Sequence, residues 1–422
     1  MMRIEPYVYQ GRFESCCSKS HAQRILILAA LYRKEVFIDH LFESRVGDDV
    51  GFMISAFRKI GYSFEENDSG LLMKPPKQNN KYSHVEINIG ESGFGLRSFA
   101  SVLSHFSKNY TLAGEKTILK RNHSSLIASI QDLGFDVESH HHELPIKITS
   151  SDTFLNDLHI DGSKGSQFLS GLLMWAIGCD KEVQIAVSNL KSIPYIDLTL
   201  DTISQFNGKV TNDGYRNFII PGGQQLQCQR ISVEGDWSSM SFHLVGAALN
   251  GEVEISGLSL NSKQADILIL EVLRVFGAVI ELNDTYIKVS KKEKKPFNID
   301  LTDAPDLFPV LSILACGAIG KSILKGTDRL VNKESNRLKS ICTMLDVFKV
   351  QYELSKCDIS INGTGEVQGG EIVTFSDHRI AMSAICAGTI SNASISIDNE
   401  DCVKKSYHDY FEDMCGILKN PY

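Results

Sequence analysis

LEVLRVFGAVIEL, at Leu270–Leu282, carries the pattern that decides the fold of this chain. A helix-like run ends in an apolar residue and a glycine, and a short alternating, β-like run follows. Glycine in this place is typical of a helix end in the left-handed conformation, which is unfavourable for other residues. Similar stretches stand at Ser55–Glu66, Ala128–Ser139, Asp201–Asn212 and Cys342–Leu354, with a weaker copy at 410–420.

The copies recur at a nearly constant period. The residues before the glycine-like position are 67 to 73 residues apart; they are Ile60, Leu133, Phe206, Phe276, Phe348 and Cys415. Leu-Gly helix ends also recur by chance in α/β proteins, but five similar gaps are not expected from chance. Each copy has room for two helices and three or four short strands. The period therefore predicts an α/β fold of six units, arranged as two pseudo-symmetric lobes of three.

Composition limits the class of protein. The chain has 422 residues, which favours two domains, and its 43% hydrophobic and 22% charged residues are ordinary for a globular protein. A net charge of −8 without a basic stripe argues against nucleic acid as the main partner. No apolar run is long enough to span a bilayer, and the first residues do not resemble a signal or transit peptide. We therefore expect a cytoplasmic protein.

Cysteine and histidine do not indicate a metal site. The chain has ten cysteines but no CxxC pair, so zinc-site spacing is absent, and we expect reduced, mostly buried thiols. The run His140–His142 could bind a metal, but three consecutive side chains point in different directions. We expect an exposed loop there.

Two polar clusters stand directly before apolar helices. The first is Ser18–Arg24, followed by the apolar run Ile25–Leu31. Free backbone N–H groups at a helix start, with Lys and Ser beside them, can bind an anion. An N-cap serine with solvated charges would explain the same residues. The second cluster is Asp161–Phe168, whose hydroxyls, glycines and glutamine amide also suit phosphate.

Further polar clusters follow along the chain. Each taken alone is explained better by a charged surface than by catalysis. They are Gly93–Arg97, Arg121, Ser192–Asp197, Ala304–Asp306, Lys333–Arg337, Ser376–Arg379 and Lys404–Ser406.

The order and spacing of these clusters resemble the EPSP (5-enolpyruvylshikimate-3-phosphate) synthase family from about Lys19 to Phe411. DGSKGSQFLSGLLM and SIPYIDLTLDTI are similar to that family almost residue for residue. The resemblance implies an inverted two-domain α/β architecture of six βαβαββ repeats. Residues 17–234 would form the N-terminal lobe and residues 1–16 with 235–422 the C-terminal lobe. The active site would lie in the cleft between them.

The resemblance also implies an activity. The enolpyruvyl group of phosphoenolpyruvate would move to the 5-hydroxyl of shikimate 3-phosphate by addition and elimination, giving EPSP and phosphate on the shikimate pathway to chorismate and the aromatic amino acids. No cofactor and no metal are implied, and we expect a monomer. Asp306 would take the hydroxyl proton, Glu334 would protonate C3 of phosphoenolpyruvate, and Lys19 would assist.

Binding roles follow by the same resemblance. Shikimate 3-phosphate would be held by Lys19, Ser20, Arg24, Ser166, Gln167, Ser192, Tyr195, Asp306 and Lys333. Phosphoenolpyruvate would be held by Lys19, Gly93, Arg121, Gln167, Arg337, Arg379 and Lys405. The seven cations among these residues exceed Asp306 and Glu334 by five charges. Two phospho-carboxylates carry roughly −5 to −6, so such a site would be neutral only with two multivalent anions bound.

Cations from both lobes would repel each other without substrate. We therefore expect the lobes to close on substrate, about two chain crossings near Cys17 and Gly235. Scattering that shows no compaction on addition of both substrates would contradict this expectation.

Several positions depart from the family pattern. Cys16 and Cys17 replace Pro-Gly, Asn122 replaces Pro, and Asn336 stands where Asp is usual. The family's Asn-Ala-Gly-Thr is Glu91–Phe94 here, with Ser98 in place of Pro. That segment governs glyphosate binding in the family, so we expect altered glyphosate sensitivity.

Two alternatives remain. The sister enzyme UDP-N-acetylglucosamine enolpyruvyl transferase would show an Asn-Lys-Asn start and a reactive loop cysteine, and no cysteine lies between Cys17 and Cys179. A non-catalytic, anion-binding relative is suggested by Glu91 and Phe94. Retention of Asp306, Glu334 and all seven cations opposes it.

Overall fold

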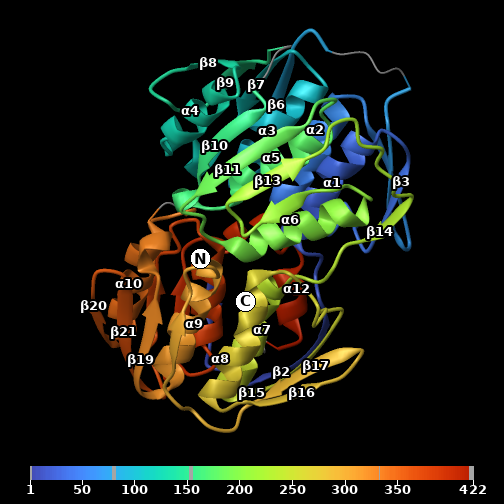
Figure 1. Ribbon diagram of the computed structural model, residues 1–422. Coiled ribbons are helices and arrows are strands. Elements are labelled where there is room, and N and C mark those ends of the chain that lie inside the picture. The colour runs from blue at the N-terminus through green and yellow to red at the C-terminus, as the bar shows by residue number, and fades with distance from the viewer. Residues whose placement is uncertain (1, 78–81, 152–154, 332, 418–422) are drawn as a thin grey trace. The chain divides into compact units, whose positions relative to one another are not determined.

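The computed structural model describes residues 2–77, 82–151, 155–331 and 333–417. The chain divides into two compact units, shown in Figure 1. Unit 1 comprises residues 1–18 and 234–422, and unit 2 comprises residues 19–233. No helix among the described residues is long and apolar enough to cross a membrane.

Unit 2 contains three four-stranded sheets. The first pairs β14 (Arg230–Ser232), β3 (Val36–Asp39), β5 (Gly70–Lys74) and β4 (Ser63–Asn67) in that order. The second pairs β6 (Val85–Asn88), β7 (Asn109–Ala113), β9 (Ile146–Thr149) and β8 (Asp136–Ser139). The third pairs β10 (Asp157–Asp161), β11 (Val183–Ser188), β13 (Asn217–Ile220) and β12 (Thr211–Asp213). In each sheet the first pair is parallel and the other two are antiparallel.

Two kinds of helix connect these strands. One kind is almost entirely buried: α1 (Lys19–Tyr32), α3 (Gly93–Val102) and α5 (Gln167–Ile177). The other kind buries one face only: α2 (Asp48–Lys59), α4 (Ser124–Asp132) and α6 (Ile193–Gln205). Short 3₁₀ helices are η1 (Leu103–His105), η2 (Lys116–Lys120) and η3 (Gly162–Lys164). Helices α3 and α5 approach so closely that a Cβ on Gly171 would lie 2.7 Å from Cα of Ser98.

Unit 1 repeats this plan. Its first sheet has the order β16 (Val279–Leu282), β17 (Tyr286–Ser290), β15 (Gly251–Ser256) and β2 (Tyr9–Glu14). Its second has the order β18 (Asn298–Asp300), β19 (Ile319–Lys325), β21 (Asp358–Thr364) and β20 (Gln351–Leu354). Its third has three strands: β1 (Met2–Ile4), β23 (Ile395–Ile397) and β22 (Gly370–Ile372).

The helices of unit 1 also form two kinds. The buried helices α7 (Trp237–Asn250), α9 (Phe308–Gly317) and α11 (His378–Ala387) all contact one another. The remaining helices are α8 (Ile269–Phe276), α10 (Arg337–Val347) and the short α12 (Tyr410–Cys415). The 3₁₀ helices are η4 (Ala265–Leu268), η5 (Pro305–Leu307), η6 (Thr327–Leu330) and η7 (Asp401–Lys405).

The predicted six-unit α/β pattern is confirmed. All six marker residues lie at the end of the second helix of a unit, namely α2, α4, α6, α8, α10 and α12. Gly61, Gly134 and Gly277 then adopt positive φ, as the helix-end pattern requires. Asn207 and Lys349 adopt the same conformation without being glycine. The last three residues of the sixth copy, 418–420, lie outside the described residues.

The chain crossings are joined within unit 1. Cys17 and Gly235 form an antiparallel bridge. On either side of it, Ser18 N donates to Glu234 O at 2.8 Å, and Asp236 N donates to Cys16 O at 3.0 Å. The segments that enter and leave unit 2 are therefore tied together at one place.

The ten cysteines are free, but the expectation that most are buried is wrong. Four are buried (Cys179, Cys228, Cys316 and Cys386), and Cys357 and Cys415 are exposed. Cys357 lies in a bend between β20 and β21, and Cys415 is the last residue of α12, so both stand where an element ends at the surface. The run His140–His142 is exposed in a turn.

Candidate active site

Most of the predicted residues of unit 2 lie at or near the N-terminal ends of α1, α3, α5 and α6, and Arg121 follows the end of η2. Helix α1 begins at Lys19, α3 begins at Gly93, and α5 begins at Gln167 with Ser166 as N-cap. Helix α6 follows Ser192, which adopts the left-handed conformation at φ 60°. The first N–H groups of each helix have no partner within the helix, and the helix dipole is positive there. These ends can therefore bind anions.

Two arginines face the start of α3. Arg97 Nη1 donates to Gln167 Oε1 at 3.1 Å and to Gly93 O at 2.9 Å. A Cβ on Gly93 would lie 3.0 Å from Arg97 Nη1 and 3.9 Å from Arg121 Nη1. Burial, together with the charge of Arg121, lowers the pKa of Arg97 to about 10. Two like charges gathered around a glycine indicate a place for an anion.

Glu91 is connected to this cluster through a hydroxyl. Arg121 Nη2 donates to Thr117 Oγ1 at 3.2 Å, and Thr117 Oγ1 donates to Glu91 Oε2 at 3.2 Å. The carboxylate that departs from the family pattern therefore belongs to the same hydrogen-bonded chain as the predicted cation Arg121.

The Arg24 side chain is buried and makes its hydrogen bonds to residues of unit 2. It is 2% exposed; its Nε donates to Thr199 Oγ1 at 2.8 Å and its Nη1 to Ser20 O at 2.7 Å. Its Nη2 donates to Tyr195 O at 3.1 Å and to Ser170 Oγ at 3.3 Å. Burial lowers the pKa of Arg24 to about 9. In this structure Arg24 holds two other predicted residues, Ser20 and Tyr195, in place.

Lys19 is already paired. Its Nζ lies 3.0 Å from Asp49 Oδ2, and both side chains are largely buried. Gln23, one turn further along α1, donates to Ser92 Oγ at 3.1 Å and so joins the starts of α1 and α3.

The predicted residues of unit 1 gather around one guanidinium group. The Arg337 side chain is fully buried. Its Nε donates to Asp377 Oδ2 at 3.0 Å, its Nη1 to Asp306 Oδ1 at 2.8 Å, and its Nη2 to Glu334 Oε2 at 2.5 Å. Burial opposes the charge, but the carboxylates raise the pKa of Arg337 above its ordinary value. Arg337 therefore joins the two predicted proton-transfer residues, Asp306 and Glu334.

Asp306 also contacts two other cations. Its Oδ1 lies 3.1 Å from Lys333 Nζ, and its Oδ2 lies 3.2 Å from Arg379 Nη2. Burial raises the pKa of this carboxyl, but Arg379, Lys333 and Arg337 together hold it well below its ordinary value. Asp306 is therefore ionised in this arrangement.

Helix α11 begins at a strained turn. Phe375 and Ser376 both adopt positive φ, at 54°, directly before the N-cap Asp377. Such backbone strain is concentrated at functional sites. Asp377 Oδ1 accepts from Arg379 N at 3.0 Å, which fixes the first turn. Lys405 is 6% exposed in η7, which packs against α11.

A protein-family model decides the relationship. The model for EPSP synthase (3-phosphoshikimate 1-carboxyvinyltransferase) matches residues 6–414. The chain belongs to the EPSP synthase family. Two similar members, both described as 3-phosphoshikimate 1-carboxyvinyltransferase, come from Methanocorpusculum labreanum and Vibrio atlanticus. The first is 30% identical over 94% of this chain and 93% of its own length. The second is 31% identical over 94% of both.

A solved EPSP synthase from Acinetobacter baumannii has the same fold. It matches with a TM-score of 0.79 at 23% identity, over 99% of this chain and 98% of its own. The two-domain α/β fold expected from the family resemblance is thus confirmed.

Several residues that contact the predicted EPSP synthase residues had not been predicted. Arg97 belongs to the cluster Gly93–Arg97 but was not assigned a role. Asp49 and Asp377 pair with predicted cations, and Glu91 was treated only as a departure. Adding these four residues reduces the positive excess of the clusters from five charges to three. An acidic residue next to an arginine in the sequence, such as Asp377 before His378 and Arg379, could have indicated such a pair.

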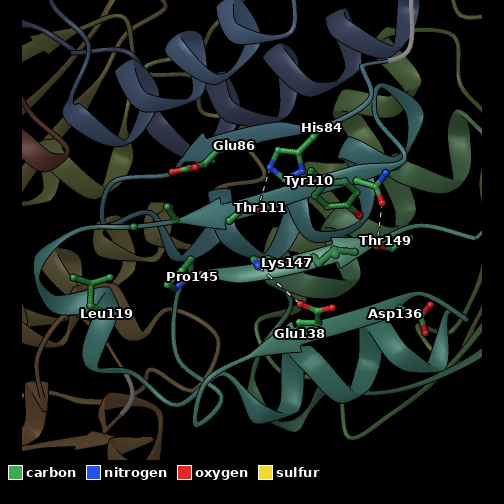
Figure 2. A pocket seen from close by; sticks show the side chains of 14 residues that line it. His84, Glu86, Tyr110, Thr111, Leu119, Asp136, Glu138, Pro145, Lys147 and Thr149 are labelled. Atoms are coloured by element: carbon green, nitrogen blue, oxygen red, sulfur yellow. Dashed lines mark hydrogen bonds and ion pairs between the residues drawn. The ribbon is translucent and has the colours of Figure 1, made fainter.

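A cavity in unit 2 is lined by other residues. It has a volume of about 660 Å³ and lies on one face of the sheet β6–β7–β9–β8. Figure 2 shows Lys147 pointing toward Glu138 there, with His84 near Thr111. The cavity contains none of the predicted EPSP synthase residues. The described residues include no group of three or more His, Cys, Asp or Glu side chains that could hold a metal ion.

Proposed function

We propose that this chain transfers the enolpyruvyl group of phosphoenolpyruvate to the 5-hydroxyl of shikimate 3-phosphate, using residues of both units. The observation that carries the proposal is the contact of one buried guanidinium, Arg337, with both Asp306 and Glu334. Action as a monomer in the cytoplasm is part of the same proposal.

The helix ends of unit 2 would bind the anionic groups. Lys19 and Ser20 start α1, and Ser166 and Gln167 start α5, so their backbone N–H groups and hydroxyls suit a phosphate. Arg97 and Arg121 at Gly93 suit the second anion, because Arg can grip phosphate or carboxylate with two parallel hydrogen bonds.

Asp306 would accept the proton of the 5-hydroxyl. An ionised carboxylate can accept a proton at once, but a pKa far below the ordinary value makes it a weak base. Bound anions would draw Lys333 and Arg379 away from Asp306. The pKa of Asp306 would then rise, so the base would strengthen only when substrate is present.

Glu334 would deliver the proton to C3 of phosphoenolpyruvate. Attack of the acceptor oxygen on C2 and protonation of C3 give a tetrahedral intermediate, in which C2 carries both the new ether oxygen and the phosphate. Loss of phosphate and removal of a proton from the new methyl group restore the double bond. Arg337 fixes Glu334 and Asp306 relative to each other through these steps.

The alternatives are less well supported. A sister enzyme would need a reactive cysteine in the segment between Cys17 and Cys179, which contains none. A relative that had lost catalysis would be expected to lose first the residues whose burial is energetically unfavourable. The fully buried Arg337 side chain contacts the carboxylates of Asp306, Glu334 and Asp377, and burial of so many charges is energetically unfavourable. Such a network would not be expected to persist in a protein that does not use it.

The test is phosphate release by the purified protein. We expect turnover that requires both shikimate 3-phosphate and phosphoenolpyruvate. Glu334→Gln should lose roughly 10²- to 10⁴-fold, the usual contribution of a positioned acid or base. Glu353→Gln, which changes an exposed acid of the same unit paired with Lys321, is the matched control and should retain full activity.

Two other outcomes are informative. Absence of turnover with shikimate 3-phosphate still bound would favour the non-catalytic relative. Failure to bind shikimate 3-phosphate at all would mean that the acceptor is wrong.

A further inference from the structure

Asp266 is a buried carboxylate that no step above uses. It is 1% exposed in η4, which packs against α7 and α8. Among the described residues, its Oδ1 has no hydrogen-bond partner. The Ser238 hydroxyl of α7 faces the carboxyl group and favours its ionised form. An ionised buried carboxylate with no cation hydrogen-bonded to it is still costly, so one would expect a neutral residue there if packing were the only requirement.

The position of Asp266 is set by its neighbour Gln264. Gln264 Nε2 donates to Gly235 O at 2.7 Å, and Gln264 Oε1 accepts from Trp237 N at 3.0 Å. Gln264 thus fixes η4 to the chain crossing and to the start of α7. Asp266 is held in place by this anchor, not by hydrogen bonds of its own Oδ1.

Arg379 also has an unused group. Its Nη2 and Nη1 contact Asp306, at 3.2 Å to Oδ2 and 3.4 Å to the backbone oxygen. Its Nε is buried and has no hydrogen-bond partner among the described residues. Asp266 is near enough to favour the charged form of Arg379, and Arg379 favours the ionised form of Asp266. The Arg379 guanidinium therefore lies near the carboxylates of Asp306, Asp266 and Glu334, and it hydrogen-bonds that of Asp306.

The charged and titratable groups that face Asp266 come from three elements. They are Arg379 of α11, Asp306 of η5 and, at the start of α7, Asp236. Asp236 is engaged as the N-cap of α7, where it accepts from Ser239 N at 2.8 Å. Burial and then the charge of Asp306 raise the pKa of Asp266 to about 6. Glu334, the third carboxylate near Arg379, is held by Arg337 Nη2. Release of Asp306 from Arg379 therefore leaves Asp266 as the counter-charge that is not already held by an arginine.

We propose that Asp266 is a positioning residue that takes over Arg379 at Nε when substrate binds, leaving both Nη groups of Arg379 for phosphoenolpyruvate and freeing Asp306. The inference rests on the proposed function. It adds to that function an exchange of partners in which Arg379 passes from Asp306 to Asp266, with no covalent change.

The first measurement compares Michaelis constants. Asp266→Asn keeps the size of the side chain and removes its charge. We expect the KM for phosphoenolpyruvate to rise about tenfold, a loss of the size that one charge-assisted hydrogen bond gives, and the KM for shikimate 3-phosphate to change less than twofold. Asp266→Glu should restore part of the loss. Glu271→Gln, which changes an exposed acid of the neighbouring helix α8, is the matched control and should change neither constant.

The second measurement does not depend on turnover. In the Glu334→Gln background with shikimate 3-phosphate present, Asp266→Asn should weaken phosphoenolpyruvate binding about tenfold. In an Arg379→Lys background, which lacks Nε, the same substitution should have little effect. The profile of kcat/KM for phosphoenolpyruvate between pH 5 and 8 should lose one inflection near pH 6 in Asp266→Asn, while ionisation of the substrate itself affects both proteins equally.

The outcomes separate the two proposals. A wild-type protein without phosphate release from the two substrates overturns the proposed function. An active wild-type protein whose Asp266→Asn variant keeps its KM for phosphoenolpyruvate and its pH profile overturns the partner exchange. Equal rises in both Michaelis constants, undiminished in the Arg379→Lys background, would make Asp266 merely structural and also overturn it.

Discussion

Arg337→Lys tests how much of the stability of unit 1 depends on its buried charge network. The substitution keeps the positive charge but replaces a planar fork by a single ammonium group. In the structure the guanidinium donates to Asp306, to Glu334 and, through two nitrogens, to Asp377. Lysine can reach one or two of these three carboxylates. The others would stay buried without their donor.

The magnitude follows from the hydrogen bonds lost. At least two charge-assisted hydrogen bonds disappear, and each contributes about 1.5 to 3 kcal/mol, so the loss is about 3 to 6 kcal/mol. With a urea dependence of about 3 kcal/mol per molar, the midpoint of unfolding should fall by about 1 to 2 M.

The two tryptophans of the chain allow the effect to be assigned to one unit. Trp237 lies in α7 of unit 1 and Trp175 lies in α5 of unit 2, and both are buried. Urea unfolding is followed by fluorescence in Trp175→Phe and Trp237→Phe backgrounds, so that each unit has its own reporter. Arg337→Lys should shift the Trp237 transition and leave the Trp175 transition in place.

Arg3→Lys is the matched control, because Arg3 belongs to the same unit and pairs with Glu5 at the surface. It should move neither transition, since exposed pairs contribute little. A Trp237 transition that Arg337→Lys leaves unmoved would refute the reasoning. Equal shifts of both transitions would refute the assignment of the cost to unit 1.

Three further predictions use the same reporters or the assay of phosphate release. Asp266→Asn should stabilise unit 1 at pH 8 by about 3 kcal/mol, because the pKa of Asp266 is raised from 3.8 to about 6 in the folded protein and each pKa unit corresponds to about 1.4 kcal/mol. The gain in stability should vanish below pH 4, where the carboxyl is protonated in both the folded and the unfolded state. A gain that persists below pH 4 would show that burial of the charge is not its cause. Burial lowers the pKa of His243 to about 3, so the unfolded state binds the extra proton below pH 6.5 and stability should fall as pH drops from 6.5 to 3; His243→Gln should flatten the dependence of the Trp237 midpoint over that range. Phe94→Thr should lower the glyphosate concentration for half-inhibition roughly tenfold, the effect of about 1.4 kcal/mol, because it removes the ring that lies 4.6 Å from the Arg24 guanidinium at the start of α3; unchanged inhibition would count against a role of Phe94.

The six-unit fold could be predicted because its signal is local. A helix end followed by a residue with positive φ depends on a few neighbouring side chains, and it recurs in five of the six copies, whereas Gly416 of the sixth has φ −70°. Asn207 and Lys349 show that tertiary packing can impose the same conformation without glycine. The third sheet of unit 1, which has three strands where the other sheets have four, could not be predicted in this way. Its edge strand β1 comes from the start of the chain and pairs with β23 near the end.

The site was predicted less completely, for a different reason. Family motifs marked the cations, but a motif does not say whether a side chain reaches outward or into the protein. Arg24 turned out to bond Ser20, Thr199, Ser170 and Tyr195 within unit 2. Asp266 carries no local signal, because its burial depends in part on the packing of η4 against α7, a separate element earlier in the chain.

The ion pairs of the structure imply a preference for multivalent over monovalent anions, which the number of cations alone would not indicate. Several predicted cations already hold a carboxylate; the pairs are Lys19–Asp49, Lys333–Asp306, Arg337–Asp377 and Arg379–Asp306. An incoming anion must therefore compete with carboxylates that are fixed at about 3 Å. A monovalent anion offers no more charge than the group it displaces, whereas a phospho-carboxylate offers roughly −2.5 to −3 and can engage several cations at once. Under the proposed function, the internal acids would exclude monovalent anions, and displacement of Lys333 and Arg379 would leave Asp306 a stronger base than it is in the free protein.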